Sequence, residues 1–367
     1  MQQNERYDLM ILKNGTILGA DFTFSQGNLC FNDKIQPSTV NDDTELDCRD
    51  AYVLPGLIDI HTHGALGFEA NDKKVDYDAW QQFLLKNGVT TFIPTTVTDT
   101  KENILYALDK LKDAVAINME GPYISDKKPG AHALEKICEL DVDFLNSVKD
   151  RVIMTTVAPE AGNNLSKLAD VVKMGIRVSV GHSMADYQTA LKAYAAGATQ
   201  VTHTFNCCPP LEHREPGLIG AAFDTDGIFC EVISDGVHVH PSIVRMLYRL
   251  LGADRVVLIS DAISPTGLSD GEYTLAGLHV FVKNAEARLA DGRLAGSTVT
   301  LTEAVRRAVK FGVPLEDAVK MASLTPARAI GKEDTIGSLE AGKDADVLVL
   351  NKDLSVRHVF YKGKQIV

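Results

Sequence analysis

Between residues 54 and 340, short runs rich in Val, Ile and Thr alternate with segments whose apolar residues recur at helical spacing. This alternation predicts βα units and a parallel sheet. Eight runs are predicted as strands: 58–63, 90–95, 115–120, 152–157, 176–182, 198–203, 228–234 and 256–261. Eight units predict a (β/α)8 barrel of the TIM type. An open doubly wound sheet is the alternative, but the GxGxxG fingerprint common in such sheets is absent.

Helix ends are also marked within this middle region. We expect Ser183 to cap the start of one helix and Gly197 to follow its last turn. Pro241 is expected to open another helix, and Gly312 to close the helix after the last strand. Residues 272–296 change to strand-like alternation, which predicts hairpins inserted after the eighth strand.

Both ends of the chain carry β patterns. Residues 7 to about 53 alternate, and Asn14-Gly15 predicts a two-residue hairpin turn. Residues 345–350 and 356–367 are predicted strands with a turn near Gly363. We therefore expect one small β-sandwich built from residues 1–53 and 341–367, with the barrel occupying residues 54–340.

The composition narrows the possible partners. The 367 residues carry a net charge of -12, and the isoelectric point is near 5.3. This argues against a nucleic-acid or anionic-membrane partner, so an anionic substrate must be held by local groups. The start lacks the pattern of a signal peptide and no apolar run reaches the length of a membrane span, which predicts a cytoplasmic protein. The six cysteines fit reduced thiols, because the only close pair is the adjacent Cys207-Cys208.

Six side chains of metal-binding type fall at the C-terminal ends of predicted strands, the face where such barrels place their active sites. They are His61, His63, Glu120, His182, His203 and Asp261. His61 and His63 share one face of a strand and can reach one metal, and Glu120 could bridge two ions. One histidine at a strand end is usually structural, and Asp261 alone could be a helix cap. Six on one face favour a metal site, with Asp261 as a general base.

The motifs extend over nearly the whole chain in order. They are Leu54-Pro-Gly-Leu-Ile-Asp-Ile-His-Thr-His63, Glu120-Gly-Pro-Tyr123, Gly130-Ala-His132, Gly181-His-Ser183, His203-Thr-Phe-Asn-Cys-Cys-Pro-Pro210, Asp235-Gly-Val-His238, Ser260-Asp-Ala262, Leu294-Ala-Gly-Ser297 and Gly342-Lys-Asp-Ala-Asp-Val-Leu348. Together they resemble the amidohydrolase superfamily and, within it, the N-acetylglucosamine-6-phosphate deacetylase family.

The resemblance implies a metal-dependent enzyme of amino-sugar catabolism on a barrel with a terminal β-sandwich. It would hydrolyse the acetamide of N-acetylglucosamine 6-phosphate to glucosamine 6-phosphate and acetate. Glu120, His182 and His203 would hold the metal common to the family, and His61 and His63 allow a second ion. We expect zinc first, with iron, manganese or cobalt as alternatives.

The resemblance also implies roles for other residues. Asp261 would be the catalytic acid and base, and His132 would orient or polarise the acetamide carbonyl. The sugar phosphate would be bound by Asn206, Cys207 and His238, and by Arg214 from the neighbouring subunit of a homodimer. The pair Cys207-Cys208 departs from the small residue and methionine common at these positions, which affects side-chain detail there. No His/Asn arrangement can be assigned to Cys207 as a nucleophile. Without the resemblance, residues 211–216 would be interpreted as a solvated loop.

Three alternatives remain at this point. The same chemistry could act on N-acetylgalactosamine 6-phosphate, which differs in the configuration of one hydroxyl. Another amidohydrolase could act on a cyclic amide, as dihydropyrimidinases do, but their bridging lysine has no counterpart at the ends of the predicted strands. A binding or scaffold protein could keep the barrel without catalysis, although such a protein would be expected to have lost ligands that are all present here.

Overall fold

The computed structural model describes residues 9–37 and 44–367. At its centre is a parallel sheet of eight strands in the order β15-β14-β13-β12-β11-β10-β9-β6. Their bounds are β6 Leu57–Thr62, β9 Val89–Thr96, β10 Ile117–Glu120, β11 Val152–Val157, β12 Arg177–Val180, β13 Gln200–Val201, β14 Phe229–Ile233 and β15 Val256–Ile259. The ends of the order meet, because the backbone N–H of Asp261 donates to the carbonyl of His61 at 2.9 Å. The predicted (β/α)8 barrel is confirmed.

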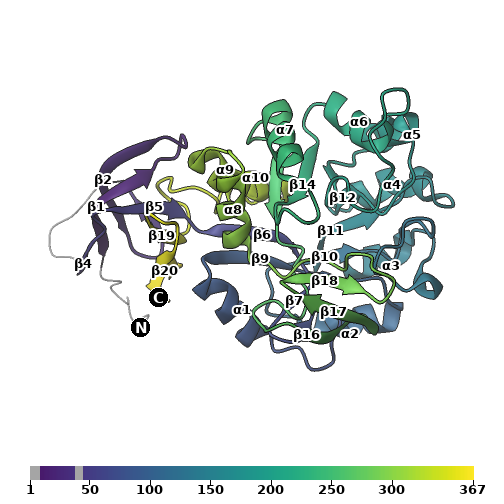
Figure 1. The fold of residues 1–367 in the computed structure, drawn as a ribbon, viewed down its shortest axis with the longest axis horizontal. Helices are drawn as coiled ribbons and strands as arrows, with labels where there is room; N and C mark the ends of the chain where they lie inside the picture. The colour runs from purple at the N-terminus through teal and green to yellow at the C-terminus, as the bar shows by residue number, and fades with distance from the viewer. Residues whose placement is uncertain (1–8, 38–43) are drawn as a thin grey trace, which may run out of the picture.

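Helices cover the outside of the barrel (Figure 1). They are α1 Tyr77–Lys86, α2 Lys101–Lys110, α3 Val142–Val148, α4 Asn164–Lys173, α5 Tyr187–Ala195, α6 Gly217–Asp224, α7 Pro241–Leu251, α8 Leu301–Lys310, α9 Leu315–Met321 and α10 Leu324–Ala329. Several begin at a side-chain cap that accepts a free backbone N–H of the first turn, as Asp76 does for α1 and Thr300 for α8. In the described residues no helix combines the length and apolar character needed to cross a bilayer.

The predicted helix ends are confirmed with one exception. Pro241 opens α7, while Gly197 and Gly312 follow α5 and α8 at positive φ. The prediction that Ser183 caps α5 is wrong, because the cap is Asp186, whose side chain accepts from the backbone N–H of Thr189. The Ser183 hydroxyl instead donates to Glu160 Oε2 at 2.7 Å.

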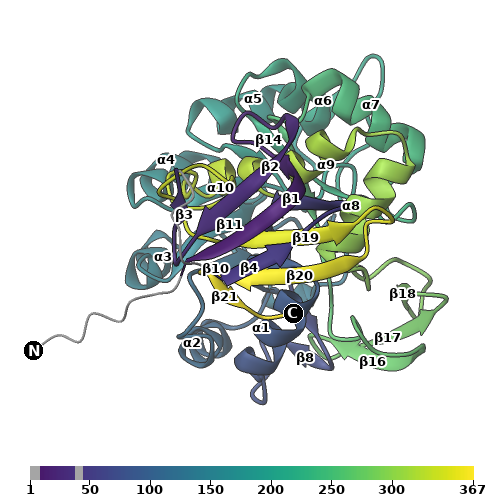
Figure 2. The same ribbon diagram turned by 90° about the vertical axis from the view of Figure 1, so that its left-hand side faces the viewer.

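A second, mixed sheet of eight strands joins the two ends of the chain, and we call it the terminal sheet. It contains β1 Met10–Leu18, β2 Phe24–Phe31, β3 Ile35–Gln36, β4 Thr44–Asp47, β5 Ala51–Pro55, β19 Val347–Asn351, β20 Val356–Tyr361 and β21 Lys364–Gln365. Figure 2 shows the C-terminal strands β19 and β20 in the same sheet as the N-terminal β1 and β2, and β5 joins the two pairs. The prediction of a small β region built from both termini is confirmed for the described residues. Its division from the barrel at residues 53/54 and 340/341 stays a prediction.

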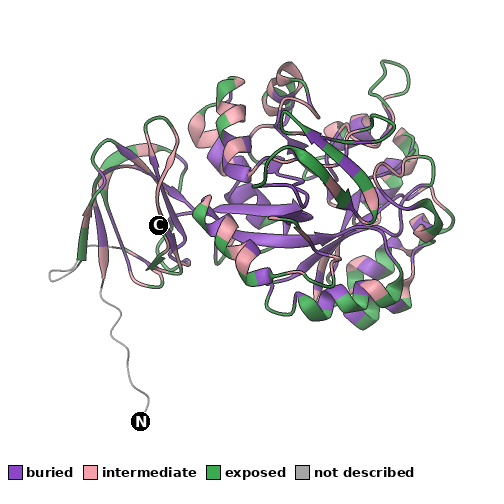
Figure 3. Cartoon of the chain, turned by 60° about the horizontal axis from the view of Figure 1, so that its bottom comes forward, coloured by how far each residue is buried: buried purple, intermediate pink, exposed green. Residues whose placement is uncertain are grey.

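The terminal sheet curls around its own apolar core, with buried faces turned inward (Figure 3). The core includes Leu12, Phe31, Val53, Val349 and Phe360. The rings of Phe31 and Phe360 pack edge to face with centroids 5.1 Å apart. This region therefore has a core of its own, separate from the interior of the barrel.

The predicted hairpin turn at Asn14-Gly15 is wrong. Strand β1 continues through both residues, and its register with β2 shifts between Leu12 and Gly15. Asn14 takes a φ of 61°, as Asn tolerates, and its amide donates to Asp47 on β4. A Cβ on Gly15 would lie 2.7 Å from Val53 Cγ2. The Asn-Gly pair thus forms a bulge demanded by the neighbouring strands rather than a turn.

The inserted hairpins after the eighth strand are confirmed as a three-stranded antiparallel sheet. It comprises β16 Gly271–Leu275, β17 Leu278–Lys283 and β18 Glu286–Leu289. Its apolar face packs with Val97 and Ile263, which come from the loops at the C-terminal ends of β9 and β15. A small pair, β7 Gly64–Ala65 and β8 Phe68–Glu69, follows β6. The insertion therefore forms one wall above the barrel.

Candidate active site and metal centre

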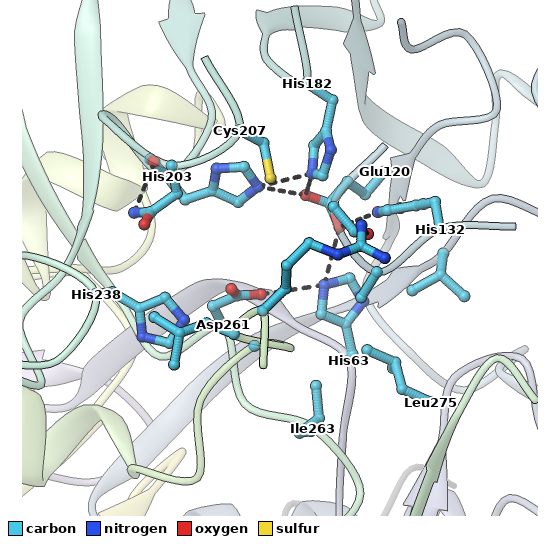
Figure 4. Close-up of a pocket in the computed structure, with 17 residues that line it drawn as sticks. His63, Glu120, His132, His182, His203, Cys207, His238, Asp261, Ile263 and Leu275 are labelled. Atoms are coloured by element: carbon cyan, nitrogen blue, oxygen red, sulfur yellow. Dashed lines mark hydrogen bonds and ion pairs between the residues drawn. The ribbon is translucent and has the colours of Figure 1, made fainter. Parts of the chain in front are cut away.

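The six strand-end residues converge in one buried cluster, which we call the barrel mouth. It consists of His61, His63, Glu120, His182, His203 and Asp261. His61 lies within β6 and Glu120 ends β10, while the others lie one or two residues beyond their strands. Figure 4 shows five of these side chains pointing toward a common centre.

Three residues of the barrel mouth have left-handed backbones. His182 has a φ of 46°, His203 of 27° and Asp261 of 49°. For non-glycine residues such conformations cost on the order of 1–3 kcal/mol each and persist only where the surroundings impose them. At Asp261 the imposing contacts are visible, since its N–H donates to His61 and its carbonyl accepts from Ser297. The strain turns each side chain from the strand end into the mouth.

Glu120 is the centre of the cluster. Its Oε1 lies 2.8 Å from His203 Nε2 and 3.1 Å from His182 Nε2. Its Oε2 lies 3.0 Å from His63 Nε2 and 3.3 Å from His132 Nε2. Burial would raise the pKa of Glu120, but the surrounding histidines, His61 and His182 first, hold this pKa well below its usual range. Glu120 is therefore an anion with one oxygen toward each half of the cluster.

The hydrogen-bond partner of Nδ1 in each histidine ring shows whether Nε2, which faces the cluster, carries a proton or a lone pair. His182 Nδ1 lies 2.9 Å from the carbonyl of Lys128, and His63 Nδ1 lies 3.0 Å from that of Thr95. A carbonyl only accepts, so in the neutral rings both Nδ1 atoms carry the proton and both Nε2 atoms present lone pairs. His61 Nδ1 has a similar partner in Glu231 Oε2 at 3.0 Å.

These lone pairs face one another. His63 Nε2 lies 3.2 Å from His61 Nε2, and His182 Nε2 lies 3.0 Å from His203 Nε2. Such contacts are repulsive unless a proton or a cation is shared between them. Imidazole nitrogens around a carboxylate are typical of protein sites for divalent transition metals, and an outer carbonyl or carboxylate orients three of these rings, those of His61, His63 and His182. The residues present therefore fit a metal ion, and two groups among the described residues have ligand atoms close enough to hold one: His61–His63–Glu120 and Glu120–His132–His182.

His132 differs from the other histidines because its Nδ1 accepts a hydrogen bond. The backbone N–H of Thr98 donates to it at 3.1 Å. Burial lowers the pKa of His132 to about 4, so the ring is neutral near pH 7. With Nδ1 accepting, the ring proton sits on Nε2, and His132 offers an N–H donor to the pocket.

Asp261 contributes a carboxylate from another side of the pocket, as Figure 4 shows. Its Oδ1 lies 3.2 Å from His63 Nε2. Burial would raise the pKa of Asp261, but His63, which donates from Nε2 when its ring is protonated, and the charge of protonated His61 lower this pKa below its usual value. Asp261 is therefore ionised near pH 7 and able to accept a proton.

A cavity of about 240 Å³ opens above the cluster. Asn206, Cys207 and His238 line it together with His132 and Asp261. The ring of His238 donates from Nδ1 to Asp235 Oδ2 at 2.7 Å, which leaves Nε2 without a described partner. The cavity thus brings together four of the five residues predicted to bind substrate.

Arg214 is the predicted site residue that the described chain does not bring to this cavity. It is exposed and lines a separate surface pocket beside Tyr187, at the start of α5. A contact with substrate would have to come from a second copy of the chain, so the role of Arg214 stays a prediction.

The sequence analysis assigned no role to three groups around the site. Glu231 lies on β14 inside the barrel, where its Oε2 bonds the ring of His61 and the N–H of His203. Asp235 orients His238, and Arg293 lines the cavity from the turn after β18. Glu231 carried a weaker signal than Glu120, because it is a carboxylate in the middle of a predicted strand and not at its end. Arg293 carried none, because only the folded insertion brings it here.

Comparison with known proteins agrees with this geometry. The Amidohydrolase family model matches residues 52–366. An N-acetylglucosamine-6-phosphate deacetylase of Vibrio furnissii is 36% identical over 86% of this chain and 82% of its own length. An N-acetylgalactosamine-6-phosphate deacetylase of Escherichia coli O157:H7 is also 36% identical, over 86% of this chain and 88% of its own.

A solved structure gives the same result at the level of the fold. A mutant N-acetyl-D-glucosamine-6-phosphate deacetylase from Mycobacterium smegmatis, in complex with N-acetyl-D-glucosamine-6-phosphate, is 33% identical with a TM-score of 0.91. The alignment covers 98% of this chain and 100% of that one. The chain described here therefore belongs to the amidohydrolase family.

Proposed function

We propose that this chain hydrolyses the acetamide of N-acetylglucosamine 6-phosphate, giving glucosamine 6-phosphate and acetate. The observation that carries the proposal is the cavity in which an ionised carboxylate, Asp261, and a neutral N–H donor, His132, flank a cluster suited to a metal. The names of the relatives support the substrate, since the M. smegmatis protein was solved with this sugar phosphate.

Glu120, His182 and His203 would hold the metal ion, and His61 and His63 would hold a second ion if one binds. Zinc is our first expectation, with iron, manganese or cobalt as alternatives, because this donor set accepts all four. A divalent ion at this place would supply Lewis-acid polarisation and would acidify water toward a pKa of about 7. Outer hydrogen bonds orient the ligand rings: His182 bonds the carbonyl of Lys128, His63 that of Thr95, and His61 the carboxylate of Glu231.

The remaining chemistry belongs to the side chains. Asp261 takes a proton from the attacking water while the water oxygen forms a bond to the acetyl carbon. The Nε2–H of His132 donates to the carbonyl oxygen as negative charge develops there. When the carbon–nitrogen bond breaks, Asp261 returns the proton to the departing amine, and acetate and the amino sugar leave.

Asn206, Cys207 and His238 would contact the sugar phosphate, and Arg214 of a second copy would complete its binding in a homodimer. The free Nε2 of His238 is available to a hydroxyl or phosphate oxygen. An arginine supplied in trans would explain why residues 211–215 are exposed in the single chain.

The test is acetate release from three sugars, and ring opening of a dihydropyrimidine, with the metal content measured on the same preparation. The sugars are N-acetylglucosamine 6-phosphate, N-acetylgalactosamine 6-phosphate and unphosphorylated N-acetylglucosamine. We expect release to be fastest with the glucosamine phosphate, to stop after chelation and to return with zinc. Preference for the galactosamine epimer, which the E. coli relative keeps possible, would correct the substrate. Turnover of the cyclic amide alone would overturn the proposal.

A further inference from the structure

The charge around the cavity is unbalanced for a dianionic substrate. The described lining contains the carboxylates Glu120 and Asp261, and the whole chain carries a net charge of -12. Among the described residues that line the cavity, Arg293 is the single lysine or arginine. A phosphate entering this pocket within one chain therefore has one permanent positive charge to meet.

Hydrogen bonds hold the side chain of Arg293 in place and leave some of its N–H groups available to a ligand. Its Nε donates to Asp291 Oδ2 at 2.7 Å, Nη2 lies 2.7 Å from the same oxygen, and Nη1 donates to the carbonyl of Gly130 at 2.6 Å. The hydrogen bond to Asp291 raises the pKa of Arg293, so the guanidinium remains charged. A guanidinium has five N–H groups, and three contacts leave two of them for a ligand.

Gly130, whose carbonyl accepts a hydrogen bond from Arg293, lies against Cys207, one of the residues expected to contact the sugar phosphate. A Cβ placed on Gly130 would be 2.7 Å from Cys207 Sγ and 3.0 Å from the ring of His182. Gly130 therefore packs directly between Cys207 and the barrel mouth. Arg293, bonded to the Gly130 carbonyl, stands at the rim on the side of Cys207.

We propose that Arg293 binds the phosphate group of the substrate from within the same chain, as a specificity-determining residue. This rests on the proposed function, because it assigns the charged end of the sugar phosphate to the hairpin insertion. Recognition of the phosphate then uses an arginine in cis, whether or not Arg214 of a second copy also reaches it. The paired N–H groups of a guanidinium suit two phosphate oxygens at once.

A purely structural role is the competing explanation. Gly130 lies two residues before His132, so the bond from Arg293 could serve only to hold the loop that carries this donor. Losing such a tether would slow phosphorylated and unphosphorylated sugars alike. Losing a phosphate contact would lower kcat/KM for the phosphorylated sugar alone. The ratio of kcat/KM for the two sugars therefore separates the two roles.

The insertion offers a matched control in Arg288. Like Arg293, it is half exposed, bonds a nearby carboxylate through Nε and Nη2, and bonds a glycine carbonyl through Nη1. It does not line the cavity. Arg288→Gln therefore removes the same charge from the same hairpins without touching the pocket.

The experiment compares wild type, Arg293→Gln, Arg293→Lys and Arg288→Gln. Calorimetry measures the Kd of inorganic phosphate, and acetate release gives kcat/KM for N-acetylglucosamine with and without its 6-phosphate. For Arg293→Gln we expect about 10–100-fold weaker phosphate binding and a similar fall in the ratio of the two kcat/KM values. Arg293→Lys should recover part of both, and Arg288→Gln should match wild type.

Three results with the variants would overturn the assignment. They are an unchanged phosphate Kd in Arg293→Gln, an equal loss on both sugars, and a loss of the same size in Arg288→Gln. A wild type that binds no phosphate would also overturn it. Failure of the proposed function looks different: wild type would release no acetate from the phosphorylated sugar, while the phosphate Kd still reports on Arg293.

Discussion

The barrel mouth and the terminal sheet bury their residues in opposite ways. The terminal sheet surrounds aromatic and aliphatic side chains such as Phe31 and Phe360, whose burial stabilises the fold without any partner of opposite charge. The barrel mouth buries a carboxylate, Glu120, among histidines, which is favourable only when every charge and lone pair is matched. One region is organised for stability and the other for binding a cation.

The backbone separates the two regions less sharply. In the turns and the bulge of the terminal sheet, positive φ occurs at Asn14 and Asp50, residue types that tolerate it, but also at Phe22, Leu354 and Lys362. In the barrel mouth it occurs at three of the predicted site residues, His182, His203 and Asp261. Positive φ alone therefore does not mark the functional region, but there it coincides with the side chains predicted to take part in the chemistry.

The largest effect we expect comes from Asp261→Asn in the barrel mouth. The amide keeps the shape but cannot take a proton, so kcat should fall about 10³-fold or more. Metal content should stay near that of wild type, because Glu120, His182 and His203 are intact. Steady-state kinetics with metal analysis on each preparation measures both.

Asp254→Asn is the control for this substitution. Asp254 is an exposed carboxylate bonded to Lys320 and Arg328, away from the cavity. Its variant should keep wild-type kcat. If Asp261→Asn also turned over at a near-normal rate with metal bound, Asp261 would lose its proton-transfer role.

Phe360→Ala makes the converse change in the terminal sheet. It empties a fully buried site against Phe31, and the free energy of unfolding should fall by about 3–5 kcal/mol. Because the residue is remote from the cavity, kcat/KM at 25 °C should stay within about twofold for the folded fraction. Chemical unfolding and kinetics on the same samples give the two numbers.

Phe281→Ala provides the comparison for burial. Phe281 lies on β17 and is 42% exposed, so its loss should change stability by less than about 0.5 kcal/mol. Equal destabilisation by both substitutions would mean that the apolar core of the terminal sheet contributes no more than a surface ring. A large kinetic defect in Phe360→Ala would show that the two regions are coupled.

Much of the fold could be predicted because its signals are local. Each barrel strand is a β-branched run of a few residues, and the rule that active sites lie at the C-terminal ends of barrel strands placed Glu120 and the histidines on one face. The prediction at Asn14-Gly15 failed because the contacts that decide it come from Val53 and Asp47, distant in sequence. Local turn propensity cannot report such contacts.

Other features of the site depended on distances that no local pattern contains. Ser183 was predicted as a cap, but Glu160 takes its hydroxyl and Asp186 does the capping. Arg293 reaches the cavity only after three inserted strands fold over the barrel. The role predicted for Arg214 would depend on a second chain, which neither the pattern nor the single chain contains.

Arg214→Ala sharpens the comparison by asking whether the barrel mouth is complete in one chain, as the terminal sheet is. If the arginine of a second copy binds phosphate, KM for the phosphorylated sugar should rise about tenfold or more. Activity per subunit should also fall on dilution below the dissociation constant of the dimer. Arg49→Ala, which removes an exposed arginine of the terminal region, should keep the KM of wild type and the same fall in activity on dilution. An unchanged KM would return residues 211–216 to a solvated loop.

The last expected effect concerns Glu69, a buried carboxylate beside the barrel mouth with no histidine among its described side-chain hydrogen-bond partners. Its Oε2 accepts from the N–H of Ala276 at 2.9 Å, and its Oε1 lies 3.2 Å from the hydroxyl of Ser264. Burial raises the pKa of Glu69 from 4.5 to about 7, the opposite of Glu120. The contrast shows that partners, and not burial alone, decide whether a buried carboxylate is charged.

The raised pKa makes Glu69 a pH-dependent cost to stability. Between pH 4.5 and 7 the folded state binds the proton of Glu69 more tightly than the unfolded state does. The stabilising contribution of this proton to the free energy of unfolding therefore falls as pH rises and is lost above pH 7. Glu69→Gln imitates the protonated acid, since its amide can donate to Ser264 and accept from Ala276. The variant should match wild type near pH 4.5 and exceed its unfolding free energy at pH 8 by on the order of 2 kcal/mol. Urea unfolding at both pH values, with each difference taken at fixed metal content, measures this. A gap that does not change with pH would show that the folded and unfolded states bind this proton equally, so that burial does not raise the pKa of Glu69.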